Sequence, residues 1–275
     1  TARLLDVQRQ AAWLPSAFAE QTASYAQALA DLVADVNNPS SIASCICAAR
    51  ENCRIVRGSV NTEIWETVNA TWLELTPLLA RDRWKKDPTE LLEWVKLRSH
   101  LFRGVSIGTM LKDEAFHFMR LGTFIERADS TARILDAKFD LEEEGQGGKP
   151  RGTTQDGRAD YYYWASVLRS VSALEIYRKV YRDVITPRRV AELLIQRADM
   201  PRSLLACMLE VCTNLEKIAD EEGGEAHRLA GRLRADLQYL RIDDAFERQI
   251  HSFLGHFLQQ MYQLGTRISH DYLGA

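Results

Sequence analysis

The stretch from Phe116 to Asp140 constrains the fold most, because its apolar residues recur at steps of three and four. On a helix, residues with this spacing align as one apolar seam that has to face other helices. The seam consists of Phe118, Leu121, Ile125, Ala128, Ala132, Leu135 and Phe139. Few segments of the chain show the two-residue alternation or the β-branched clusters that are typical of strands. The sequence therefore predicts an all-α fold, a bundle of roughly nine to eleven helices.

Charged residues follow one strip of surface beside this seam. Glu126 and Arg133 stand seven residues apart, and Asp129 and Asp136 lie at i−4 and i+3 from Arg133. Spacing alone favours a ladder of salt bridges, since such pairs are common on helices and individually weak. The alternative is that the strip is part of a binding site.

A short part of the same stretch is nearly repeated at the start of the chain, and this repeat is called the echo below. Thr131–Asp136 reads TARILD and Thr1–Asp6 reads TARLLD, so five of six residues are identical. A period of 130 residues is too long for a solenoid repeat. The echo is either a chance match or the trace of one duplicated long helix or half-domain.

Helix signals divide the chain before the central stretch. We expect a helix over 1–13, a break at Pro15 and an Ala-rich helix over 16–36. Ser40 or Ser41 is the expected cap of the next helix, which should stop near residue 58. Asn61 should open a helix that ends before Pro77. A further helix should run from 87–90 to 103 or 104, and another from about 109 into the central stretch.

Residues 141–160 are polar and Gly-rich and have no apolar period, which predicts a flexible connection. After it we expect a helix from Tyr161 to about Val184 and a short one that opens at Thr186-Pro187. Another should start near Met200-Pro201, and residues 221–224 should separate it from a helix over 225–239. A last helix should run from Asp243 to about 272. Both sides of the connection are helical and similar in composition, so we expect them to share one core.

The composition of the chain argues against some classes of binding partner. The chain has 275 residues and is 46% hydrophobic, which is enough for a sizeable core in one large or two small domains. A net charge of −3 gives no general attraction to nucleic acid or to an anionic membrane. No apolar run approaches the roughly 20 residues of a membrane span. We therefore expect neither nucleic acid nor a membrane as a partner.

The cysteines lack both the CxxC spacing of metal sites and a secretory signal ahead of them. They are Cys45, Cys47, Cys53, Cys207 and Cys212. Reduced thiols in a cytoplasmic protein are the default interpretation, with the cysteines acting as small buried hydrophobes.

Metal and cofactor chemistry have weak support. Glu114 and His117 form a Glu-x-x-His pair, which di-iron bundles use twice, but this chain holds no second copy. Glu247 and His251 at i,i+4 are another conceivable metal pair with nothing to fix their geometry. There is no nucleophile elbow and no phosphate-binding glycine loop after a strand, so the chain alone is not expected to bind ATP. We predict no metal and no cofactor.

The best candidate for a binding site in the sequence is a set of arginines spaced among carboxylates and one histidine. Its members are Arg98, His100, Arg103, Asp113, Glu114, Arg120, Glu126, Arg127, Arg133, Arg169 and Glu175. Arginine binds carboxylates and phosphates through a two-pronged fork, so a groove of them would suit a peptide C-terminus, an acyl phosphate or an acidic partner. If the face of Arg120 and Arg127 is buried, Asp113, Glu126 and Glu175 would instead serve to offset charge. The residues alone leave both interpretations open.

A family resemblance adds to this interpretation. Residues 120–136, RLGTFIERADSTARILD, resemble the signature of the bacterial alpha-E family, whose members are helical proteins with a recurring Glu-Arg motif. Further similar stretches are 38–41, 49–52, 98–104, 108–114, 168–175, 186–190, 201–203 and 228–232. The resemblance covers nearly the whole chain and implies one helical domain over 1–275. It also implies that a native segment with its own Glu-Arg pair precedes Thr1.

The resemblance implies a functional context as well. Alpha-E proteins are encoded beside, or fused to, circularly permuted ATP-grasp amide ligases, often near transglutaminase-like peptidases and proteasome-like hydrolases. We therefore expect an accessory protein that binds such a ligase, or its peptide substrate, through the Arg/Glu surface. One alternative is an enzyme that uses Glu126, His100 or His117 as acid or base and arginines to hold an anionic substrate. Another is a purely structural bundle. The oligomeric state is left open.

Overall fold

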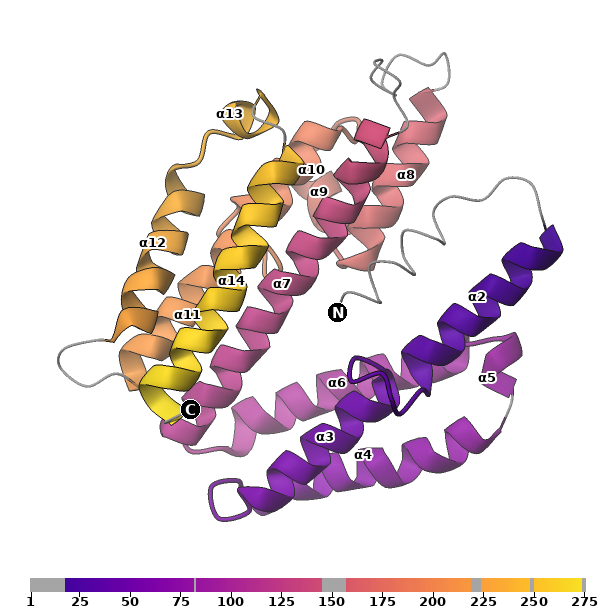
Figure 1. Ribbon diagram of the computed structural model, residues 1–275, viewed down its shortest axis with the longest axis vertical. Coiled ribbons are helices and arrows are strands. Elements are labelled where there is room, and N and C mark those ends of the chain that lie inside the picture. Colours follow the sequence, from indigo (N-terminus) through magenta and orange to yellow (C-terminus); the bar gives the residue numbers. More distant parts are fainter. Residues whose placement is uncertain (1–17, 82, 145–156, 219–223, 248–249, 274–275) are drawn as a thin grey trace. The chain divides into compact units, whose positions relative to one another are not determined.

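A computed structural model describes residues 18–81, 83–144, 157–218, 224–247 and 250–273. Within these ranges the chain forms 13 helices, 11 of them with seven or more residues, and no strands (Figure 1). The predicted all-α fold is confirmed. The chain divides into two compact units, Thr1–Phe116 and His117–Ala275. No helix in the described ranges is long and apolar enough to cross a membrane.

Unit 1 is built on three helices that pack along one another. Its elements are α2 (Phe18–Val33), α3 (Ile42–Ile55), α4 (Thr62–Ala80), α5 (Arg83–Lys86) and α6 (Thr89–Thr109). Arg50 of α3 donates from Nε to the Asn69 amide oxygen of α4 at 2.8 Å. Asn61, at the start of α4, donates to the carbonyl oxygen of Thr109 at 2.9 Å, so α4 and α6 are antiparallel. The buried cluster of this unit is small: Val33, Leu75, Trp84 and Leu91.

Caps set the helix starts in unit 1 as the sequence predicts. The Ser41 hydroxyl accepts from the Ser44 amide at 3.1 Å, and the Asn61 side chain accepts from the Ile64 amide at 3.0 Å. The predicted end of α4 before Pro77 is wrong, because the helix continues to Ala80. Pro77 lies in the last turn, where its ring deprives only the Leu73 carbonyl of a helical bond. Leu73 itself lies on the exposed side of the helix.

The junction between α6 and α7 (Glu114–Glu144) also differs from the prediction. Helix α6 continues past residue 104 to Thr109, and α7 begins at Glu114 rather than near 109. Met110 has extended backbone angles that end α6. The Asp113 carboxylate then accepts from the Phe116 amide at 3.1 Å, which is the contact of an N-cap.

Unit 2 has as its centre a ring of four antiparallel helices. They are α7, α11 (Leu204–Ile218), α12 (Glu225–Tyr239) and α14 (Ile250–Leu273), while α8 (Gly157–Ser170), α9 (Leu174–Tyr181), α10 (Pro187–Ile195) and α13 (Ile242–Glu247) complete the unit. On one side of α7, His117 and Arg120 contact Asn214 and Glu210 of α11. On the other side, Phe118 and Asp136 contact Tyr272 and His251 of α14. Helix α12 closes the ring, since it packs on both α11 and α14 (Figure 1).

The predicted apolar seam of α7 faces this core. Leu121, Ala128, Ala132, Leu135 and Phe139 are buried, and Phe118 and Ile125 pack against the cluster as partly buried residues. Each large side chain that is fully buried stabilises the fold by about 1.5–3 kcal/mol. The Phe139 ring lies 4.9 Å from that of Trp164 on α8, centroid to centroid. Helices on both sides of 145–156 therefore contribute to the same core.

Three predicted segments in unit 2 need correction. Helix α7 extends to Glu144 and α8 begins at Gly157, so both ends of the predicted 141–160 connection are helical. The helix predicted over 161–184 is wrong because α8 ends at Ser170, where Ser172 adopts the left-handed conformation with φ 56°. The Ala173 amide then reaches back to the Leu168 carbonyl at 2.7 Å, a Schellman-type stop. The predicted last helix is divided into α13 and α14.

Other predicted features agree with the structure or lie outside it. Thr186 caps α10 with Pro187 in the first turn, and α12 covers 225–239 as predicted. The predicted helix over 1–13, its echo of residues 131–136 and the connection over 145–156 lie outside the described residues.

Candidate functional site: the charged residues of helix α7

Glu126 and Arg127 lie in the middle of α7 and have different surroundings. The Arg127 side chain is half-buried, and its Nη1 donates to the carbonyl oxygen of Pro201 at 3.3 Å, just before α11. Its guanidinium carbon lies 4.9 Å from the centre of the Phe124 ring. Glu126 is exposed and accepts a long hydrogen bond of 3.4 Å from the Ser130 hydroxyl. Successive helical residues point about 100° apart, so one member anchors α7 to the core while the other faces outward.

Arginine side chains of α7 tie this helix to α11. Arg120 Nη2 lies 2.7 Å from Glu210 Oε2, and the Arg120 guanidinium carbon lies 4.6 Å from the Phe124 ring centre. Phe124 thus contacts two guanidinium groups, an arrangement that contributes about 0.5–1 kcal/mol per pair at exposed sites. One turn earlier, His117 Nδ1 lies 2.9 Å from the Asn214 side-chain oxygen.

The acidic strip forms the predicted ladder only in part. Arg133 donates two hydrogen bonds to the Asp129 carboxylate, at 2.6 and 2.9 Å, which is the i,i+4 contact expected from spacing. Asp136 instead lies 2.7 Å from His251 of α14. Glu126 contacts Ser130 and belongs to neither pair.

Cys207 lies under this network, and its thiol is buried. Burial raises the pKa of Cys207 to about 12, against a smaller opposing effect of Arg127 and Arg202. The thiol therefore stays protonated at neutral pH and is a poor nucleophile. Cys212 is buried too, so the prediction of buried cysteines is confirmed for these two. It is wrong for Cys45, which is exposed on α3.

The predicted residues of unit 1 occupy α6 and the turn after it. Arg98 makes an ion pair with Glu74 of α4, and its guanidinium carbon lies 5.3 Å from the Trp94 ring centre. Arg103 is half-buried, whereas His100 is exposed. Asp113 and Glu114 are exposed at the start of α7, and Asp113 serves as the cap described above.

Arg169 and Glu175 lie on α8 and α9, and both are exposed. Glu175 makes a long ion pair of 3.4 Å with Arg178, one turn further on. Ten of the eleven predicted residues therefore fall into two groups, and the eleventh, Arg103, is half-buried. Arg98, Arg120 and Arg133 are paired with acids and Arg127 with a carbonyl, while His100, Asp113, Glu114, Glu126, Arg169 and Glu175 are exposed.

The sequence did not predict several of the residues that contact the charged side chains of α7. The acid that pairs with Arg120 is Glu210, not Asp113, Glu126 or Glu175. Glu210 and Arg120 are 90 residues apart, and only the antiparallel packing of α11 on α7 joins them. The same is true of Asn214 and of the Pro201 carbonyl. Helical periodicity predicts which face is buried, but not which helix covers it.

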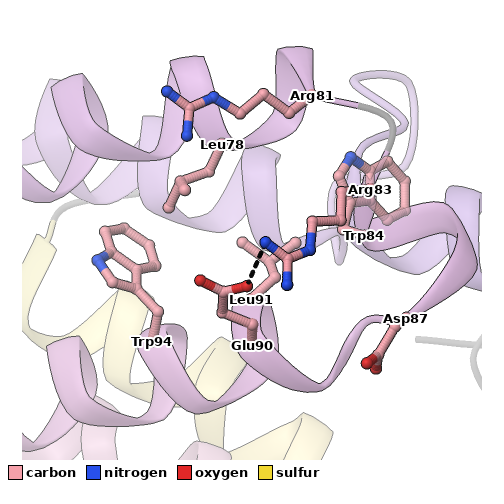
Figure 2. A pocket seen from close by; sticks show the side chains of 8 residues that line it. All are labelled: Leu78, Arg81, Arg83, Trp84, Asp87, Glu90, Leu91 and Trp94. Atoms are coloured by element: carbon pink, nitrogen blue, oxygen red, sulfur yellow. Dashed lines mark ion pairs between the residues drawn. The ribbon is translucent and has the colours of Figure 1, made fainter.

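One cavity of about 160 Å³ lies in unit 1, where α4 ends and α6 begins (Figure 2). Its lining residues are Leu78, Arg81, Arg83, Trp84, Asp87, Glu90, Leu91 and Trp94. Figure 2 shows Leu78 and Arg81 on one side and Trp94 on the other, with the 3.5 Å ion pair of Arg83 and Glu90 beside them. The apolar wall and charged rim would suit a small group with an apolar body and a charged end.

Two grooves in unit 2 lie along α12 and α14. One has a volume of about 450 Å³ and an apolar wall that includes Leu237 and Phe257. The other, of about 370 Å³, is lined by arginines. None of the eleven predicted residues lines these grooves or the cavity of unit 1.

Metal ligands do not assemble in the described part of the chain. No group of three or more His, Cys, Asp or Glu residues there is placed to hold a metal ion. Of the Glu-x-x-His pair, Glu114 is exposed, and His117 is hydrogen-bonded to Asn214 through Nδ1.

Comparison with known proteins places this architecture in a family. A search of curated proteins and a search of solved structures each found no match. The Alpha-E family model, described as a predicted alpha-helical domain with a conserved ER motif, matches residues 1–273. The chain has Glu-Arg pairs at 126–127 and 247–248, and the first is the one whose contacts are given above. Since the match extends over almost the whole length, the chain belongs to the Alpha-E family.

Proposed function

We propose that this chain is an accessory protein that works with a circularly permuted ATP-grasp amide ligase and binds the ligase or its peptide substrate. The observation that carries the proposal is the division within the Glu126-Arg127 pair. Arg127 is held by the Pro201 carbonyl, whereas the Glu126 carboxylate is exposed on the same helix. An exposed carboxylate on a rigidly packed helix is well suited to contact a basic group of a partner.

The distribution of the other charged residues supports binding over catalysis. An enzyme gathers its acid, base and anion-binding groups around one concave site. Within unit 2, the exposed members Glu126, Arg169 and Glu175 come from three helices, α7, α8 and α9, and the two grooves of that unit contain none of them. Such dispersed charges favour electrostatic recognition of a large partner.

A purely structural role accounts for only part of the set. It explains Arg98, Arg120 and Arg133, whose charges are offset by acids of the same unit. It assigns no purpose to exposed charges such as Glu126 and Arg169, which contribute little to stability at the surface.

Co-purification from the native cells tests the proposal. Tagged full chain, its Glu126→Gln variant and a Glu216→Gln control would be compared, after circular dichroism has verified that all three fold. Glu216 is an exposed glutamate of α11 outside the predicted set, so the control makes the same chemical change elsewhere.

We expect an ATP-grasp ligase to co-purify with the wild type and the control, and to be lost or strongly reduced with Glu126→Gln. Absence of any ligase from the wild-type eluate would contradict the accessory role. Equal recovery with Glu126→Gln would show that the partner is bound elsewhere.

A further inference from the structure

The arginine-lined groove of unit 2 lies between α12 and α14, apart from the predicted residues. Arg228 and Arg232 project from α12 one turn apart, and Arg267 projects from α14. Glu225, Leu229 and Gln263 complete the lining of this groove, whose volume is about 370 Å³. Residues four apart share a helix face, so both walls direct guanidinium groups toward one space.

Acidic residues offset this positive charge incompletely. Arg228 Nη1 is 2.7 Å from the carboxylate of Glu225. The acid nearest to Arg267 along α14 is Asp271, which attracts Arg267 weakly and whose Oδ2 already accepts from the Ala226 amide at 2.9 Å. In the described part of the chain, no carboxylate lies within ion-pair distance of Arg232 or Arg267. Among the described residues, the lining of the groove therefore has three arginines and one acid, Glu225.

Several other arginines of unit 2 are closely paired with acids. Arg120, Arg133 and Arg188 each contact a carboxylate at 2.6–2.7 Å. Gathering like charges on neighbouring helix positions is destabilising unless an anion offsets them. The whole chain has a net charge of −3, so the excess of arginines in the groove lining is a local feature and not a general basic character.

The shape and chemistry of the groove indicate the class of ligand. Guanidinium groups bind phosphate oxygens with paired hydrogen bonds, and Gln263 adds an amide donor. Three guanidinium groups around one hollow suit a compact tetrahedral anion, whereas an acidic protein segment would need a longer row of cations. A volume of about 370 Å³ falls within the range of roughly 300–1,000 Å³ that is usual for small-molecule sites.

We propose that the groove between α12 and α14 binds the phosphoryl group of a small phosphorylated ligand through Arg228, Arg232 and Arg267. The source of that group is either free phosphate or pyrophosphate, or a phosphate ester. This site involves residues other than those of the proposed ligase contact, so either proposal can fail without the other.

Isothermal titration calorimetry on the full chain at low salt tests this site. The titrants are pyrophosphate, orthophosphate and phenyl phosphate, and the variants are Arg232→Gln and Arg267→Gln. We expect each variant to bind the best titrant at least about tenfold more weakly, because it loses a charged hydrogen-bond donor. Arg232→Lys keeps the charge without the fork and should fall between Arg232→Gln and the wild type.

Arg241→Gln is the matched control, since Arg241 is exposed, belongs to the same unit and does not line the groove. It should bind like the wild type. The titrant that binds most tightly through Arg232 and Arg267 identifies the source of the phosphoryl group.

Three results would overturn the proposal. One is no binding of any titrant at millimolar concentration, and another is unchanged affinity in both glutamine variants. The third is tighter binding of an oligoglutamate peptide than of all three phosphates through the same arginines, which would assign the groove to an acidic protein segment.

Discussion

The two units of this chain are held together in different ways. In unit 2, long helices share one large apolar cluster in which Leu135, Leu168 and Trp164 are fully buried. In unit 1 the buried cluster has four members, and polar bridges such as Arg50–Asn69 and Asn61–Thr109 join the helices. Ten of the fourteen exposed large hydrophobic residues in the described chain belong to unit 1, among them Leu97 and Leu101 of α6.

The larger core of unit 2 makes that unit the better support for a charged binding motif. Close-packed cores fix the helices that form them, and a fixed helix presents its outward side chains in one geometry. Helix α7 is anchored in unit 2 by its apolar seam and by Arg120 and Arg127. Glu126 therefore projects from a rigid support.

The largest expected difference between the two units is in the rate at which their cysteines react. The raised pKa of Cys207, about 12 against an ordinary 9.0, lowers its thiolate fraction at neutral pH roughly a thousandfold. Iodoacetamide followed by peptide mass spectrometry should label Cys45 of unit 1 quickly and leave Cys207 unlabelled until the chain unfolds. Equal labelling rates in the folded protein would show that Cys207 is as accessible as Cys45 and would contradict its buried position.

Two leucine truncations should sharpen the comparison in terms of stability. Leu135→Ala removes a fully buried side chain of unit 2, and we expect a loss of about 2–5 kcal/mol in the free energy of unfolding. Leu97→Ala, at 62% exposure in unit 1, should change it by less than about 0.5 kcal/mol. Urea unfolding followed by circular dichroism measures both. A large loss in Leu97→Ala would contradict the exposed position of that leucine.

A cap from one helix to another should have an intermediate effect. Asp271 of α14 accepts from the Ala226 amide in the first turn of α12, and Asp271→Ala should cost about 1 kcal/mol at pH 7. The matched change in unit 1 is Asn61→Ala, which removes the α4 cap and the bond to Thr109. We expect a cost of similar size, because caps depend on hydrogen bonds and not on core size.

The Asp271 effect should depend on pH. The hydrogen bond from the Ala226 amide lowers the pKa of Asp271 below its ordinary value of 3.8. The carboxylate therefore contributes stability above pH 3.8 that is lost as the pH falls through the lowered pKa. The difference in urea midpoint between wild type and Asp271→Ala should shrink as the pH falls below 3.8, and a constant difference would assign it to packing.

The sequence predicted the positions of individual helices better than it predicted which helices pack together. The seam from Phe118 to Phe139 and the caps at Ser41, Asn61 and Thr186 rest on local periodicity and turn chemistry, and the structure confirms them. The errors at Pro77 and Ser172 come from local rules that tertiary context overrides. A proline is tolerated in the last turn of a helix, where it removes a single backbone hydrogen bond, and a serine can take the left-handed position usually given to glycine.

The candidate site was less predictable, because its geometry depends on which helices pack together. Spacing placed Arg133 with Asp129 correctly, since both lie on one helix. It could not assign Glu210 to Arg120 or His251 to Asp136, which come from α11 and α14. The groove of Arg228, Arg232 and Arg267 was missed for the same reason, as its two walls are separate helices.

The central proposal is that the two residues of the Glu-Arg pair have different roles: Arg127 stabilises the fold, and Glu126 binds the partner. The most direct measurement combines urea unfolding with a titration of the purified ATP-grasp ligase, for Glu126→Gln and Arg127→Gln. We expect Arg127→Gln to lose about 1 kcal/mol of unfolding free energy, since it removes the Pro201 contact and the Phe124 stacking. Glu126→Gln should change stability by less than about 0.5 kcal/mol and weaken ligase binding about tenfold or more. Full ligase affinity in Glu126→Gln, or a stability loss as large as that of Arg127→Gln, would contradict this division.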